Sequence, residues 1–260
     1  MIQRSGVFHC HYDFLFMMRS TKQLLTTTVF LLILEFTANG QYNIDSFKLV
    51  QQVRLNGVWH HAQGVQSGIY SGREYMDYTR LLKEGHPYFD TSLALASIDY
   101  SGVVYEQVPV LLDLIKEELI AQHANKVFLV QLVKSKITSF SFNGHFFEHL
   151  GRDSLRNKTG LSDGFYDRVY DGQKARFYVR RQKTIQEVIE NLQVNKLVRN
   201  ADRYYIFKDD QYHSVRTKAS VTKLLGHKKQ LSQALRHNNV KFKKNRERAI
   251  HLMVQTFDSL

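Results

Sequence analysis

Turn-forming residue pairs recur along this chain between runs of alternating apolar and polar side chains, and this spacing limits the possible folds more than any other feature. The pairs are Asn56-Gly57, Ser101-Gly102, Asn143-Gly144, Asp171-Gly172 and Asp209-Asp210. Such pairs favour the tight turns that join antiparallel strands, because their residues tolerate a positive φ angle. The sequence therefore predicts a meander of many short antiparallel strands.

Two segments between these turns fit more than one secondary structure. The apolar residues of 111–122 satisfy both a helical and a strand period, and we favour two short strands because strand-like segments lie on both sides. In the segment 184–198, Ile185, Val188, Ile189 and Leu192 recur at helical spacing. For this second segment we expect a short helix or a mobile loop.

The C-terminal residues change to a helical period. Three short apolar stripes follow one another, within Val221–Leu225, Leu231–Leu235 and Ala249–Phe257. We expect Ser220 to cap the first helix and Asn238-Asn239 to end the second. Because short helices need a surface on which to pack, the predicted fold is α+β and mainly β. It is an antiparallel meander or sandwich-like sheet with short C-terminal helices packed on it.

The N-terminal residues have the pattern of a secretory signal. Arg19 and Lys22 precede an apolar run over residues 24–34, and Ala38-Asn39-Gly40 supplies the small residues of a cleavage site. The run is too short to cross a bilayer core of roughly 30 Å as a helix. We expect residues 1–40, an N-terminal extension and signal peptide, to be removed. The mature chain would begin near Gln41, would have no transmembrane segment, and would be periplasmic or secreted.

Positive charge is concentrated near the C-terminal end. The chain has a net charge of +12, and residues 216–251 contain eleven Lys or Arg residues against one acidic residue, Glu247. We therefore divide the mature chain into a β-rich domain, 41–215, and a basic helical tail, 216–260, packed on that domain. For an exported protein the expected partners are an anionic envelope component or an acidic protein surface, and not nucleic acid.

Five cations of the tail stand close together and are the predicted partner-binding residues: Lys241, Lys243, Lys244, Arg246 and Arg248. At this density several of them must share one face or one turn. The alternative interpretation is that they only solvate the outer face of a helix.

The tail also resembles a known group of sequences. The runs Val221–Leu225, His227–Leu231 and Val240–Lys244 are similar to the tail of a group of exported Bacteroidetes proteins. Gly164-Phe165-Tyr166, Val169-Tyr170-Asp171-Gly172 and Tyr204-Tyr205-Ile206 stand in the order found in that group. The resemblance covers roughly residues 85–260. It implies export and a β-rich body followed by helices, and it assigns no functional residue.

One motif points to a different function. His145-Phe146-Phe147-Glu148-His149 matches the H-x-x-E-H pattern of inverted zinc metallopeptidases, where two histidines on one helical turn bind Zn²⁺ and the glutamate activates water. Here the motif follows Asn143-Gly144, which favours a strand, and residues four apart on a strand are ~13 Å from each other. A secreted zinc-dependent hydrolase that uses His145, Glu148 and His149 is therefore the alternative function.

Other chemically interesting residues lack a supporting context. The adjacent His60 and His61 would point to opposite faces of a strand, and Ser154 lacks the G-x-S-x-G context of an esterase. Cys10, the only cysteine, would be lost with the signal peptide, which removes disulfides and thiol chemistry. The sequence thus predicts no catalytic residue, no cofactor and no metal. It predicts an exported, non-enzymatic envelope protein that binds or scaffolds through its basic tail.

Overall fold

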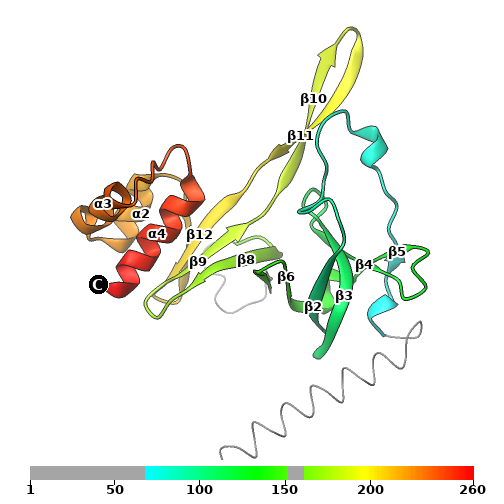
Figure 1. The fold of residues 1–260 in the computed structure, drawn as a ribbon, viewed down its shortest axis with the longest axis horizontal. Coiled ribbons are helices and arrows are strands. Elements are labelled where there is room, and N and C mark those ends of the chain that lie inside the picture. Colours follow the sequence, from blue (N-terminus) through cyan, green and yellow to red (C-terminus); the bar gives the residue numbers. More distant parts are fainter. Residues whose placement is uncertain (1–67, 152–160) are drawn as a thin grey trace, which may run out of the picture. The chain divides into compact units, whose positions relative to one another are not determined.

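A computed structural model describes residues 68–151 and 161–260 of the chain (Figure 1). The predicted signal peptide, the Asn56-Gly57 turn, the His60-His61 pair and Ser154 lie outside these residues. In the described part, strands dominate the chain up to residue 215, and three α-helices follow.

Eleven strands form one sheet in the order β1-β5-β4-β3-β2-β6-β7-β8-β9-β12-β13, with antiparallel neighbours throughout. Most neighbours in the sheet are also neighbours in the sequence, which confirms the predicted antiparallel meander and the mainly β, α+β class. The strands are β1 (Arg73–Glu74), β2 (Ala94–Tyr100), β3 (Val103–Asp113), β4 (Glu118–Gln122), β5 (Leu129–Gln131), β6 (Ile137–Phe142), β7 (His145–Leu150), β8 (Gly164–Asp171), β9 (Arg176–Arg180), β12 (Arg203–Lys208) and β13 (Gln211–Val215). Short 3₁₀ turns occupy Gly68–Tyr70, Thr79–Leu81 and Lys134–Lys136.

The predicted turns join these strands. The φ angles are 55° and 77° at Ser101-Gly102, 49° and 77° at Asn143-Gly144, and 51° and 57° at Asp209-Asp210. Both central residues of each turn therefore lie in the left-handed region, as this type of two-residue hairpin requires. Asp171-Gly172 opens a longer connection between β8 and β9. The ambiguous segment 111–122 is the end of β3, a turn and β4, so the preference for strands is confirmed.

One hydrophobic core is formed mainly by side chains of β2, β3, β4, β6, β7 and β8 that pack against one another. Its centre is an aromatic stack in which the ring centroid of Phe147 lies 4.8 Å from that of Phe140 and 5.6 Å from that of Phe142. Phe89 meets the Phe147 ring edge-on at 5.8 Å. Phe147 is completely buried, because it faces inward from the middle of β7.

The three helices cover one face of the other end of the sheet. They are α2 (Lys218–Leu225), α3 (Lys228–His237) and α4 (Arg246–Ser259). Their buried apolar residues form a second core with residues of β9, β12 and β13, among them Phe177, Ile206 and Val215. The expected packing of the apolar helix stripes on the sheet is therefore confirmed. No helix in the described part of the chain is long and apolar enough to cross a membrane.

Thr217 caps α2, so the prediction that Ser220 is the cap was wrong. The Thr217 hydroxyl accepts a hydrogen bond from the Ser220 N–H at 3.1 Å, and the Ser220 hydroxyl accepts one from the Thr217 N–H at 3.1 Å. This reciprocal pair is a capping box, in which Ser220 is the third helical residue. The predicted end of α3 is confirmed at Asn238.

Residues 184–198 form a β-hairpin, and the expectation of a helix or loop was wrong. β10 (Lys183–Glu190) and β11 (Gln193–Asn200) pair along their whole length and are joined by Asn191-Leu192, with φ angles of 50° and 63°. The apolar residues of β10 are β-branched, which favours a pleated strand over a helix. The pairing continues the register of β9 and β12, so this ribbon extends from the sheet (Figure 1). We call β10 and β11 the arm.

Candidate functional site

The five predicted partner-binding cations are all exposed at the start of α4 and in the turn before it. The apolar stripes of the helices face the sheet, which leaves the charged side chains on the outside. None of the eleven Lys or Arg residues of the tail forms an ion pair with a carboxylate in residues 68–151 or 161–260. The positive charge of this surface is therefore not neutralised by neighbouring acidic groups.

The tail's two acidic side chains are used elsewhere. Glu247 points to Arg181, which directly follows β9, and its carboxylate accepts hydrogen bonds from the Arg181 guanidinium at 2.5 and 2.8 Å. Asp258 accepts hydrogen bonds from the backbone N–H groups of Gln173 and Lys174 at 3.1 and 2.6 Å. Both carboxylates thus attach α4 to the sheet and leave the outer face of the tail purely basic.

Three of the five predicted cations share one cavity of about 310 Å³, which we call the α4 cavity. It is lined by Asn239, Val240, Lys241, Lys244, Asn245 and Arg248. Asn245 is the N-cap of α4, and its side chain accepts a hydrogen bond from the Arg248 N–H at 3.2 Å. The positive end of the α4 dipole therefore adds to the charge of the three side chains.

A second basic cavity of about 780 Å³, the arginine cleft, lies beside the start of β12 and the end of β13. Arg246 of α4 lines it together with Arg203 and Arg216. The Arg246 guanidinium lies 6.0 Å from the ring centroid of Tyr204, at the outer limit of a cation–π contact. Sequence reasoning missed Arg203 because its proximity to Arg246 depends on how the helices pack on the sheet.

The structure therefore separates the predicted residues into two groups. Lys241, Lys244 and Arg248 line the α4 cavity, Arg246 lines the arginine cleft, and Lys243 is exposed and lines neither. The arginine cleft also contains Asp202, whose pKa is raised because burial disfavours its charged form. The α4 cavity has no acidic residue in its lining and is the more purely basic of the two.

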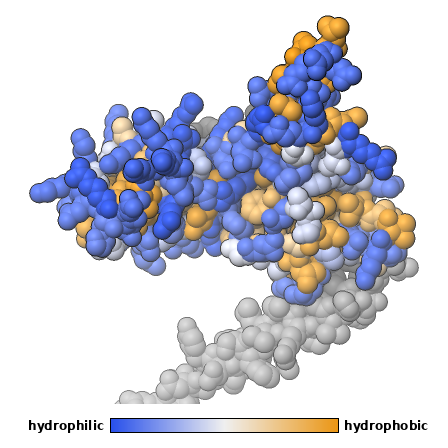
Figure 2. Space-filling model, turned by 45° about the horizontal axis from the view of Figure 1, so that its top comes forward, coloured by the Kyte–Doolittle hydropathy of each residue, from blue (hydrophilic) through white to orange (hydrophobic). Residues whose placement is uncertain are grey.

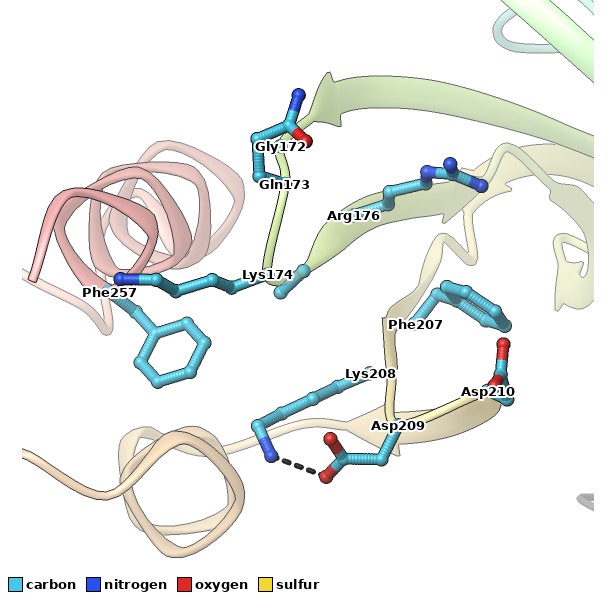
Figure 3. A pocket seen from close by; sticks show the side chains of 10 residues that line it. Gly172, Gln173, Lys174, Arg176, Phe207, Lys208, Asp209, Asp210 and Phe257 are labelled. Atoms are coloured by element: carbon cyan, nitrogen blue, oxygen red, sulfur yellow. Dashed lines mark hydrogen bonds and ion pairs between the residues drawn. The ribbon is translucent and has the colours of Figure 1, made fainter.

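A third cavity, of about 500 Å³, has a mixed charge (Figure 3). It lies between the β8–β9 connection, the β12–β13 turn and Phe257 of α4. Two of its cations have acidic partners, since Lys208 contacts Asp209 at 2.5 Å and Arg176 contacts Asp171 at 2.8 Å. This cavity is therefore a weaker candidate for an anionic ligand than the two basic ones.

The residues of the H-x-x-E-H motif lie on β7, as the turn before them predicted. Each is bound to a different partner. His145 Nδ1 lies 2.8 Å from Asp167, His149 Nε2 lies 2.8 Å from Asp163, and Glu148 accepts a hydrogen bond from Arg168 at 2.9 Å. In the described residues no group of three His, Cys, Asp or Glu side chains is arranged to hold a metal ion. The helical turn that the zinc peptidase pattern requires is not formed here.

His145 belongs to a buried charge network that sequence reasoning did not identify. Asp167, only 1% exposed, contacts both His145 and Arg181, and Arg181 also binds Glu247 of α4. The hydrogen bond to Asp167 raises the pKa of His145, and it outweighs the opposing effects of burial and of the Arg181 charge. The network joins β7, β8, the residue that follows β9, and α4.

This shift gives a pH dependence with a definite sign. Because the pKa of His145 is higher in the folded than in the unfolded protein, the stabilisation from its protonation is complete below its ordinary pKa of about 6.5. It is lost as the pH rises through the folded pKa. An NMR titration should place the His145 midpoint above about 6.5, and Asp167→Asn should lower it. A midpoint below the ordinary value, or one that Asp167→Asn leaves unchanged, would contradict the assigned hydrogen bond.

Comparison with known proteins adds no assignment to this geometry: no family model matches the chain, and no curated protein or solved structure matches it.

Proposed function

We propose that this protein is an exported, non-enzymatic envelope protein that binds an anionic partner through its basic tail. The observation that carries the proposal is the unneutralised positive surface around the start of α4. Lys241, Lys244 and Arg248 converge on one cavity, and no described carboxylate pairs with any of them. Export rests on the signal-like pattern of residues 18–40.

The packing of the helices supports a binding role for these cations. Val221, Leu225, Leu231, Ile250 and Val254 are buried against the sheet or against one another. The helices are therefore held in place by apolar contacts, and their basic faces are free to meet a partner. A cation near an anionic surface contributes ~1 kcal/mol to binding, so a few converging cations are enough for useful affinity.

The test is a charge reversal at the predicted site. Changing Lys241, Lys243 and Lys244 together to Glu should weaken binding of the mature protein to isolated envelope fractions by about a hundredfold, since each reversal removes ~1 kcal/mol or more. Folding should be retained because all three side chains are exposed. Binding is measured by co-sedimentation across a salt series, and unfolding temperature is measured in parallel.

A matched control separates a local site from overall charge. Lys223, Lys228 and Lys229 are also exposed tail residues, and changing them to Glu alters the net charge equally. The proposal predicts that this control loses much less affinity than the first variant. Equal losses in the two variants would show that net charge alone acts, and absence of binding at low salt would leave the cations with a solvating role only.

A further inference from the structure

In the part of the chain that the structure describes, one strand edge of the arm is unpaired. Along β10, the backbone N–H and C=O groups of successive residues point alternately toward β11 and away from it. One set of residues therefore bonds to β11, and the other set has its backbone groups on the outer edge. The outward set is identified by Lys183, whose N–H donates to the Leu114 carbonyl at 3.0 Å instead of to β11. By the same alternation, the N–H and C=O groups of Ile185, Glu187 and Ile189 also point outward, and no backbone hydrogen bond within the described residues reaches them.

The opposite edge of the arm is protected. The Val198 N–H donates to the Glu84 carbonyl at 3.0 Å, and the Lys83 N–H donates to the Lys196 carbonyl at 2.9 Å. The residues before β2 therefore cover the β11 edge near the base of the arm. Within the described residues, Ile185, Glu187 and Ile189 of β10 therefore present a row of unpaired backbone groups, which is a template for pairing with another strand.

The arm also exposes apolar side chains that have no core to enter. The exposed fractions are 37% for Ile185, 75% for Ile189, 99% for Leu192 and 59% for Val194. Figure 2 shows hydrophobic surface gathered at the end of the projecting part of the molecule. An isolated two-stranded hairpin is marginal in water, and a third or fourth strand stabilises it. The arm therefore has both a free edge and a physical reason to acquire a neighbouring strand.

The sequence of β10 matches this edge to a second copy of itself. In an antiparallel pair, outward residues must face outward residues, which restricts the possible registers. The register centred on Glu187 places Ile185 opposite Ile189 of the second copy on both sides of the axis. The next register that still opposes outward residues is reached by moving the second copy two residues along the strand. This shift places an isoleucine opposite Glu187 or beyond the strand end. The centred register gives two Ile185–Ile189 pairs, more apolar cross-strand pairs than any other permitted register, together with the hydrogen bonds.

The charges of the arm are compatible with such a pair. Glu187 lies 4.0 Å from Lys196, and Glu190 lies 2.9 Å from Lys83. The two copies of Glu187 meet at the axis, and each of these carboxylates has its own Lys196 partner. In the resulting four-stranded sheet, Val198 and Val194 of β11 extend the two isoleucine rows.

We propose that two copies of this chain form a two-fold symmetric dimer by pairing their β10 edges, with Glu187 at the axis. This inference goes beyond the proposed function and uses a surface separate from the basic tail. The paired edge is short, so the dimer is weak and depends on concentration. Two copies with a net charge of +12 repel each other, so added salt favours the dimer. The same salt weakens binding to a polyanion, so the two properties can be distinguished.

Crosslinking tests the register directly. In a Cys10→Ser background, Glu187→Cys places two thiols at the axis, where the Cα atoms of a directly opposed pair are about 5.5 Å apart, a distance that a disulfide bridges. Mild oxidation should give a covalent dimer rapidly. Leu192→Cys is the control, because it is more exposed but lies beyond the paired residues in this register. Equal crosslinking rates for the two variants would overturn the proposal.

Sedimentation analysis of the mature, uncrosslinked chain gives an independent measurement. Ile189→Lys should raise the dimer dissociation constant by about tenfold or more, because it places a charge in both apolar rows. Leu192→Lys should have little effect. A chain that stays monomeric at every soluble concentration would overturn the proposal. Binding of that monomer to lipid vesicles, lost in Leu192→Lys, would instead identify the arm as a membrane-contacting tip.

Discussion

Replacing Arg181 by methionine is expected to lower the free energy of unfolding by about 3–5 kcal/mol, because it leaves the buried Asp167 carboxylate without its arginine counter-charge. The Arg181 side chain is 11% exposed and contacts Asp167 at 2.7 Å and Glu247 at 2.5 Å. Asp167 is 1% exposed and cannot recover its lost interaction from water. Its remaining partner, His145, neutralises it only when protonated.

Arg176→Met is the matched control for this variant. Arg176 is the first residue of β9, the strand that Arg181 directly follows, but its side chain is 40% exposed and its partner Asp171 is 48% exposed. Pairs of this kind contribute about 1 kcal/mol or less. Urea unfolding of both variants at neutral pH measures the difference. Equal losses in the free energy of unfolding would show that solvent screens the charges of the Arg181 network as strongly as those of a surface ion pair.

The Arg181 network also illustrates which parts of the fold could be predicted from the sequence. Ser101-Gly102, Asn143-Gly144 and Asp209-Asp210 revealed their hairpins because the turn chemistry is local and the flanking runs alternate. By contrast, Asp167, Arg181 and Glu247 are far apart in the sequence, and nothing local distinguishes them from surface charges. Their burial follows from the packing of α4 on the sheet.

The arm was not predicted because its apolar spacing has two interpretations. Ile185, Val188, Ile189 and Leu192 fall on one face of a helix, and this pattern competes with strand alternation. Two local signals favour the hairpin. Three of these four apolar residues are β-branched, and asparagine tolerates the positive φ of 50° that Asn191 adopts in the turn. Leu192 obscured the turn, because a leucine with a φ of 63° is an unusual choice for that position.

The grouping of the cations of the tail was predicted in part. The density of cations between 241 and 248 indicated a shared surface, and Lys241, Lys244 and Arg248 do line one cavity. Arg246 turns instead toward residues of β12 and β13, since adjacent helical positions point in different directions. Tertiary packing therefore sets the grouping of these cations, and the sequence sets only their number.

Phe147→Ala should be the most destabilising single truncation in the core of β2 to β8, with a loss of about 3–5 kcal/mol in the free energy of unfolding. Phe147 is completely buried, and its ring contacts those of Phe89, Phe140 and Phe142. Removing it leaves a cavity whose walls are strand residues held by backbone hydrogen bonds on both sides, so the walls cannot collapse to fill the space. The unfolding temperature should fall by roughly 10 °C.

Its neighbour on the same strand provides the control. Phe146 points to the opposite face of β7, is only partly buried, and lies under the Arg168 guanidinium at 4.5 Å from the ring centroid. Phe146→Ala removes the same atoms and should cost about 1 kcal/mol or less, mainly through that cation–π contact. Thermal unfolding of both variants, followed by circular dichroism, measures the contrast. Similar losses at the two positions would mean that β7 does not present one face to the core. The register of β6, β7 and β8 would then be wrong, because a shift by one residue exchanges the two faces.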